Sequence, residues 1–238
     1  MTSHNGWTIA FDADETLWHN DVFYKKARND FTHLIAPNDA DIALKKLHDL
    51  ENKNRSIYGF GMRSVMLNMI ELAAEYDIAS AQIFDILQIG KKVLNQSFPL
   101  SEGIEDLLKS LKAQNYRLIC VTKGDLKDQK YKMSTTPLEG YFEHIEVVIR
   151  KDENEWQHII KMLNLKPQTT VMVGDSLKGD ILPALNMGFF GVWIPQKNMP
   201  YFDAYQPENI PSNNPRFKQL SQINKLPQYL EHLKTQKG

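Results

Sequence analysis

Short hydrophobic runs, rich in β-branched and aromatic residues, recur along the chain with polar segments between them. They occupy residues 7–11, 116–121, 145–149, 169–173 and 190–194. Runs of this length and composition, bounded by turn-forming residues, predict buried β-strands.

From about residue 100 onward, segments with apolar residues at helical spacing separate these runs. They cover residues 104–111, 156–163 and 178–187, the last followed by Gly188 as a helix stop. Alternation of strand and helix predicts an α/β fold, with a parallel sheet covered by helices on both faces.

Residues 20–96 interrupt this alternation because they contain no strand-like run. Their periodicity predicts helices at 21–35, 39–52, 63–76 and 80–95. We therefore expect a helical insertion after the first strand, with the chain returning to the sheet at residues 98–103. The polar, proline-containing tail after Pro195 ends in an amphipathic segment at 226–233.

Composition narrows the class of protein. The 238 residues are 42% hydrophobic and 24% charged, enough apolar material for a folded core. A formal net charge of −1 argues against a nucleic-acid binder, and locally basic residues 123–132 contain acids that favour a solvated helix face. Because the sequence has neither a signal peptide nor an apolar stretch long enough for a bilayer, and a lone Cys120, we expect a cytoplasmic protein without membrane association.

The first candidate for chemistry directly follows the first hydrophobic run, in Phe-Asp-Ala-Asp-Glu-Thr-Leu-Trp at residues 11–18. Ligands of open parallel sheets gather at the carboxyl ends of the strands. Asp12 and Asp14 would lie there, suited to sharing a cation or dividing nucleophilic and proton-transfer roles. An acidic turn without function remains the alternative at this point.

A second acidic pair, Asp175 and Asp180, follows the run at 169–173 in Gly-Asp-Ser-Leu-Lys-Gly-Asp. Helix capping by Asp175 or Ser176 explains one polar residue here but not both acids. Carboxylate pairs at strand ends of one sheet would repel each other strongly without a positive charge between them, and Mg²⁺ is the expected cation.

Two further groups would complete a phosphate site. Thr122 and Lys123 follow the run at 116–121, so a hydroxyl, an ammonium and backbone amides could hold phosphoryl oxygens. Lys151 follows the run at 145–149, with Arg150 beside it as an alternative cation.

Asp-x-Asp-x-Thr, then Thr, then Lys, then Gly-Asp-Ser-x-x-x-Asp resembles the haloacid dehalogenase (HAD) superfamily over residues 7–195. The resemblance implies a Rossmann-like core in which Asp12 attacks phosphorus and Asp14 acts as acid and base. It implies that Thr122 and Lys151 bind the phosphoryl group. It also implies that Asp12, the backbone carbonyl of Asp14 and Asp175 hold Mg²⁺, with Asp180 ligating through water or steadying the site.

The same resemblance indicates a branch of the superfamily and a domain organisation for the chain. The second aspartate, Asp14, favours phosphatases over dehalogenases, and Glu15 departs from the usual Asp or Gly outside the chemical roles. The insertion matches the position of the family's helical C1-type cap, so we expect a core at 1–18 and 99–238 and a cap at 19–98. Arg63 is its most plausible substrate contact.

The leading hypothesis is therefore magnesium-dependent hydrolysis of a small phosphomonoester through an aspartyl-phosphate on Asp12, by a monomer or homodimer. A phosphomutase, another hydrolase of the superfamily such as a dehalogenase or phosphonatase, and a non-catalytic receiver-like switch stay as alternatives. The physiological substrate is not predicted.

Overall fold

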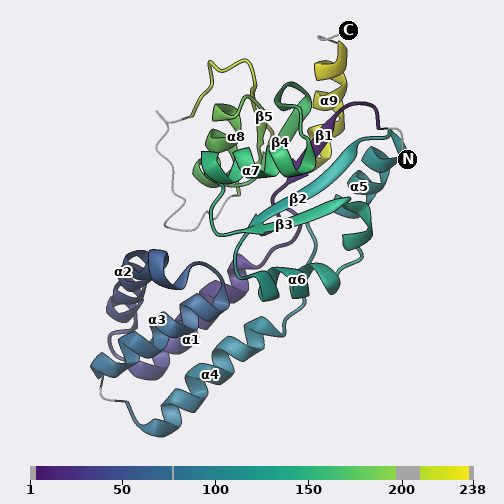
Figure 1. Ribbon diagram of the computed structural model, residues 1–238. Coiled ribbons are helices and arrows are strands. Elements are labelled where there is room, and N and C mark those ends of the chain that lie inside the picture. Colours follow the sequence, from purple (N-terminus) through teal and green to yellow (C-terminus); the bar gives the residue numbers. More distant parts are fainter. Residues whose placement is uncertain (1–3, 77, 197–209, 236–238) are drawn as a thin grey trace. The chain divides into compact units, whose positions relative to one another are not determined.

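The computed structural model describes residues 4–76, 78–196 and 210–235, and the chain divides into two compact units. The core unit comprises Met1–His19, Pro99–Lys123 and Met133–Gly238 (Figure 1). The helical unit comprises Asn20–Phe98 and Gly124–Lys132. No helix in the described ranges combines the length and hydrophobicity needed to span a bilayer.

A six-stranded parallel sheet forms the centre of the core unit, in the order β3-β2-β1-β4-β5-β6. The strands are β1 Thr8–Phe11, β2 Arg117–Lys123, β3 His144–Val148, β4 Thr170–Gly174, β5 Phe190–Trp193 and β6 Phe217–Gln219. All the predicted strands and the α/β class are confirmed, but β3 is only partly buried because it lies at the edge of the sheet. Strand β6 was not predicted, because this short edge strand is partly exposed and has no hydrophobic run to identify it.

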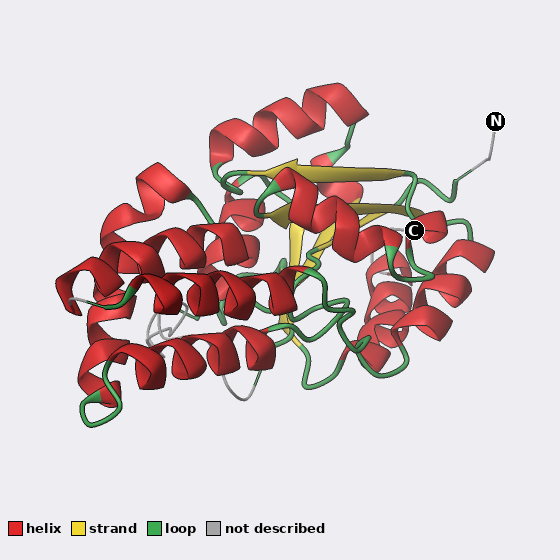
Figure 2. Ribbon diagram, turned by 90° about the horizontal axis from the view of Figure 1, so that it is seen from below, coloured by secondary structure: helices red, strands yellow, loops and turns green. Residues whose placement is uncertain are grey.

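The helices of the core unit lie between the strands in sequence, and Figure 2 shows helices above and below the strands. They are α5 Ile104–Ala113, α7 Glu153–Leu163, α8 Leu182–Asn186 and α9 Leu226–Thr235, and α6 Leu126–Ser134 spans both units. Shorter turns are η2 Glu139–Tyr141, η3 Pro167–Thr169, the π-helical η4 Leu177–Ile181 and η7 Ile223–Lys225.

Alternate strand residues bury against opposite layers. Ala10, Ile119 and Met172 share one cluster with Trp156 of α7 and Ala184 of α8, all fully buried. Because side chains alternate along a strand, their neighbours on the same strands point to the other face, where α5 contacts β2. Burial on both faces explains why these strands read as continuous apolar runs.

The strand order places a topological switch point between β1 and β4. Strands β2 and β3 add to one side of β1, and β4, β5 and β6 add to the other. In register, Phe11 lies opposite Cys120 of β2 and Val173 of β4, so these three strands end at one edge of the sheet. Open α/β sheets bind ligands at this position.

The helical unit consists of α1 Asp21–Ile35, α2 Ala40–Tyr58, α3 Met62–Ala73 with η1 Ala74–Tyr76, α4 Ser80–Leu94 and the start of α6. Its predicted helices are confirmed, but α2 continues six residues past the predicted end at 52. Polar residues hide this last part from a hydrophobic pattern. Its buried Asn54 donates hydrogen bonds to Asn68 and Glu71 of α3.

The solvated helix face expected within residues 123–132 is present, with Leu126, Lys127, Lys130 and Tyr131 exposed, but the opposite face of α6 is buried. Asp128, Gln129 and Lys132 are buried, and the Lys132 ammonium lies 5.6 Å from the ring centre of Tyr24 and 5.5 Å from that of Phe98. The aliphatic stem of a lysine packs on apolar surface while its charge lies over aromatic faces, so a basic sequence does not by itself require exposure.

Candidate active site at the carboxyl ends of the strands

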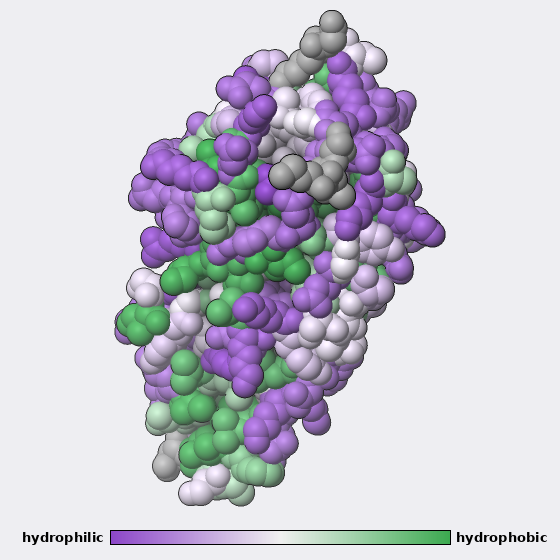
Figure 3. Space-filling view, turned by 45° about the vertical axis from the view of Figure 1, so that its right-hand side comes forward, coloured by the Kyte–Doolittle hydropathy of each residue, from purple (hydrophilic) through white to green (hydrophobic). Residues whose placement is uncertain are grey.

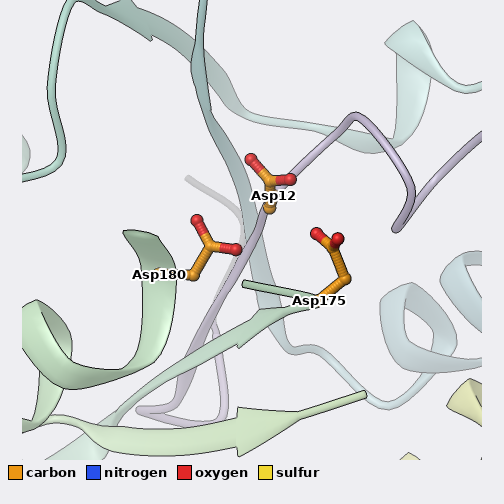
Figure 4. Close-up of side chains that lie close together, drawn as sticks. All are labelled: Asp12, Asp175 and Asp180. Carbon is orange, nitrogen blue, oxygen red and sulfur yellow. The ribbon is translucent and has the colours of Figure 1, made fainter. Parts of the chain in front are cut away.

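Three aspartates converge at the switch point. Asp12 follows β1, Asp175 follows β4, and Asp180 lies in the π-helical turn η4. Each offers a carboxylate oxygen within 4.8 Å of the others, and all three residues are buried. Figure 4 shows the three carboxylates facing a common space.

Lys151 joins this group from the segment after β3. Its buried ammonium donates hydrogen bonds to Asp12 and, at 2.7 Å, to Oδ1 of Asp180. Arg150, the alternative cation, is exposed. We call Asp12, Asp175, Asp180 and Lys151 the strand-end cluster.

The cluster perturbs its own ionisation. Burial, followed by the nearby Asp180 charge, raises the pKa of Asp12 from 3.8 to about 7, although Lys151 acts in the opposite direction. Burial would lower the pKa of Lys151, but Asp12 and Asp180 outweigh it, so that this pKa rises. Three buried acids facing one ammonium therefore leave an excess of negative charge at the site.

The excess charge and the donor set fit a divalent cation. Carboxylate oxygens are the ligands that Mg²⁺ prefers, and a cation among them would offset the repulsion from Asp180 that adds to the effect of burial on the pKa of Asp12. Asp12, Asp175 and Asp180 are the residues that could hold it.

Hydrogen bonds within the loop after β4 position the Asp180 side chain. Ser176 caps the following turn, since its hydroxyl accepts a hydrogen bond from the Gly179 N–H at 2.9 Å. The Ser176 N–H in turn donates to Oδ2 of Asp180 at 3.1 Å. A Cβ at Gly174 would overlap the Asp180 carboxylate, so glycine is required there. Because Ser176 provides the cap, neither Asp175 nor Asp180 is needed for capping, and both belong to the strand-end cluster.

Thr122 and Lys123 occupy the end of β2, next to β1. Thr122 is 2% exposed and lies in register with Val147 of β3. The Lys123 charge acts on Asp12 and lowers its pKa, although less than Lys151 does. A Cβ at Gly179 would overlap the Lys123 ammonium, which places this cation beside η4.

Asp14 lies outside the three-carboxylate group and has a partner that the sequence motif does not reveal. The indole Nε1 of Trp18 donates to its Oδ1 at 2.7 Å, and Trp18 is 1% exposed. Thr16 similarly donates to Oδ1 of Asp175 at 3.5 Å. Both donors lie within the motif at 11–18, but only the folded loop shows which carboxylate each one meets.

Arg63 lies in the helical unit, in the first turn of α3. Its guanidinium is 2.6 Å from Oδ1 of Asp125 and also forms an ion pair with Asp128. We call Arg63, Asp125 and Asp128 the helical-unit cluster.

The model of the haloacid dehalogenase-like hydrolase family matches residues 8–188, which include the whole strand-end cluster. The chain belongs to this family. A haloacid dehalogenase-like hydrolase from Xanthomonas campestris has a similar structure, with a TM-score of 0.84 and 27% identity over 97% of this chain and 92% of that one. A putative HAD hydrolase from Bacillus subtilis, YfnB, shares the fold at 19% identity, with a TM-score of 0.66 over 94% and 98% of the two chains.

Curated relatives of this HAD hydrolase are phosphatases. A glyceraldehyde 3-phosphate phosphatase from Pyrococcus furiosus is 26% identical over 97% of this chain and 94% of its own length. An N-acylneuraminate-9-phosphatase from Rattus norvegicus is 32% identical over 42% of each chain. The predicted superfamily and the predicted enzyme class, a phosphoric monoester hydrolase, are thereby confirmed.

Proposed function

We propose that the chain hydrolyses a small phosphomonoester with Mg²⁺ through an aspartyl-phosphate on Asp12. The observation that carries this proposal is the strand-end cluster. It combines a buried carboxylate, two further acids and a buried ammonium at the switch point of a parallel sheet. Such a site matches phosphoryl transfer, in which positioning and charge stabilisation supply most of the catalysis.

In the first half-reaction, a carboxylate oxygen of Asp12 attacks phosphorus. The Asp12–phosphorus bond forms as the bond from phosphorus to the substrate alcohol breaks, and Asp14 gives its proton to the leaving oxygen. Lys151 and Lys123 offset the charge of the phosphoryl group, and the Thr122 hydroxyl binds one of its oxygens.

In the second half-reaction, Asp14 takes a proton from water, and the resulting hydroxide oxygen attacks phosphorus. The bond to Asp12 breaks, inorganic phosphate leaves, and Asp14 is again protonated for the next cycle. The Trp18 indole orients the Asp14 carboxylate through both steps.

Asp12, Asp175, Asp180 and the backbone carbonyl of Asp14 would hold Mg²⁺. When bound, the ion neutralises charge on the attacking carboxylate and on the phosphoryl oxygens.

A triose phosphate is the first substrate to test, because the Pyrococcus furiosus relative that matches most of the chain is a glyceraldehyde 3-phosphate phosphatase. We further propose that residues 19–98 act as a cap that excludes bulk water and selects the substrate, with Arg63 as a contact. We keep the expectation of a cytoplasmic monomer or homodimer.

The test is phosphate release from a panel of sugar, triose and nucleoside phosphates and from 4-nitrophenyl phosphate, with and without Mg²⁺. We expect Asp12→Asn to lower the rate by about 10³-fold or more, because removing a nucleophile abolishes the covalent route. The surface variant Asp106→Asn, on the exposed side of α5, is the matched control. Full activity of Asp12→Asn, or of the wild type in excess chelator, would refute the mechanism.

A further inference from the structure

A pocket apart from the strand-end cluster lies entirely within the core unit. It has a volume of about 420 Å³, within the range of small-molecule sites. Its walls are the end of the motif loop, the chain entering α5, the segment after β5 and residues 221–224. None of the strand-end cluster residues lines it.

Three of its lining residues form a connected chain of side chains. The Ser101 Oγ is 3.4 Å from Nε2 of His19, and Nδ1 of His19 is 3.2 Å from Oε2 of Glu15. An ionised carboxylate only accepts hydrogen bonds, so Nδ1 carries the proton. The unprotonated Nε2 can then accept a hydrogen bond from the Ser101 hydroxyl. Nucleophile, base and orienting carboxylate are thus in the order that serine hydrolases use, at separations common before substrate binds.

The backbone holds these three residues in register. The Ser101 N–H donates to the Leu17 carbonyl and the His19 N–H to the Pro99 carbonyl, each at 2.9 Å. Glu15 has a φ of 58°, in the left-handed region, and its carbonyl accepts a hydrogen bond from Gln196 at 2.7 Å. A non-glycine residue is held in that region only when its surroundings fix it.

Donors for an oxyanion lie next to Ser101. Glu102 and Gly103 line the pocket directly before α5, and Gly103 has a φ of 72°. Among the described residues, neither of their N–H groups has an assigned hydrogen-bond acceptor. Backbone N–H groups beside a nucleophile, at the positive end of a helix dipole, stabilise the charge of a tetrahedral intermediate.

We propose that this pocket is a second catalytic site, which hydrolyses small carboxylic esters. The Ser101 oxygen attacks the ester carbonyl carbon while its proton passes to Nε2 of His19, and that proton then leaves with the alcohol as the carbon–oxygen bond breaks. Water attacks the acyl-serine, gives a proton to Nε2, and the acid leaves as the proton returns to Ser101. Ester and water become acid and alcohol, so no other reactant is needed.

The test compares hydrolysis of 4-nitrophenyl acetate by the full chain and its variants in excess chelator. We expect saturable hydrolysis that Ser101→Ala and His19→Gln each lower by about 100-fold, the scale of base-assisted nucleophilic catalysis. Ser110→Ala, an exposed serine on α5, is the matched control and should retain the wild-type rate. Equal rates for wild type and Ser101→Ala would overturn the proposal.

A covalent probe makes the test independent of how the variants fold. We expect a fluorophosphonate to modify wild-type protein once, with fragment masses placing the adduct on Ser101. An adduct elsewhere, or none, would overturn the proposal. Phosphate release from 4-nitrophenyl phosphate with Mg²⁺ on the same preparation tests the Asp12 mechanism separately, so failure of one site is distinguishable from failure of the other.

Discussion

The strand-end cluster and the helical-unit cluster both pair a cation with two acids, but in different surroundings. Lys151 meets Asp12 and Asp180 with side-chain exposures of 0%, 8% and 1%. Arg63 meets Asp125 and Asp128 with exposures of 40%, 37% and 6%. The ion-paired side chains are therefore all buried in the core unit, whereas in the helical unit Arg63 and Asp125 are part-exposed and only Asp128 is buried.

Burial decides what each ion pair does. In the core unit, burial of the ion pairs costs desolvation free energy and raises the pKa of Asp12, and a third acid, Asp175, lies beside them. In the helical unit, water screens Arg63 and Asp125, so this pair adds less stability than those of Lys151, and the ion pairs of Arg63 mainly hold the start of α6. The buried ion pairs of the strand-end cluster cost desolvation free energy, and the proposed catalytic role would explain why they are buried.

The largest effect should come from Lys151→Met, which removes the buried cation and leaves its stem. We expect phosphate release to fall by about 10³-fold, since one stabilising donor contributes that much. The metal-free protein should lose about 3–5 kcal/mol of unfolding free energy, because two buried acids lose their partner. Kinetics and urea unfolding in chelator measure these changes, and a variant as active as the wild type would show that Lys151 is only structural.

Trp18→Phe should have the next largest effect, because it removes the N–H that meets Asp14 but keeps an aromatic ring. A hydrogen bond to a charged group contributes about 1.5–3 kcal/mol, so we expect kcat to fall tenfold to a hundredfold. KM should change less than twofold, because the role proposed for Asp14 is proton transfer and not substrate binding. Trp7→Phe, a buried residue directly before β1, is the control, and equal losses in both variants would assign Trp18 to packing.

Stabilisation by Mg²⁺ should depend on pH. The folded-state pKa of Asp12 is raised to about 7, so its protonated form stabilises the metal-free protein below pH 3.8, and this contribution is lost as pH rises through 7. Because the proton must leave before metal binds, the rise in Tm on adding Mg²⁺ should be larger at pH 8 than at pH 5.5. Thermal unfolding measures this difference, and Asp12→Asn should reduce it. A rise independent of pH would contradict the prediction.

The smallest effect on stability should come from Arg63→Met, the counterpart of Lys151→Met in the helical unit. We expect a loss of about 1–3 kcal/mol, smaller than for Lys151→Met, because Arg63 and Asp125 are part-exposed and only Asp128 is a buried acid that loses its partner. Urea unfolding measures it. A loss as large as that of Lys151→Met would remove the contrast between the two clusters.

Local pattern was sufficient for most of the fold. Apolar runs identified β1 to β5, and periodicity identified α1 to α5, because burial imposes a repeat on neighbouring residues. It failed where burial leaves no such repeat, at the exposed edge strand β6 and at the polar end of α2.

The sequence by itself determined the chemistry available, with paired acids after two strands and Thr122, Lys123 and Lys151 after two others. Only the tertiary structure decided which groups meet. It placed β1 between β2 and β4, buried Lys151 while Arg150 stayed exposed, and brought Ser101 to His19 across 82 residues. Residue type and spacing act over a few neighbouring residues. These contacts depend on which distant segments pack together, and no short sequence pattern shows that.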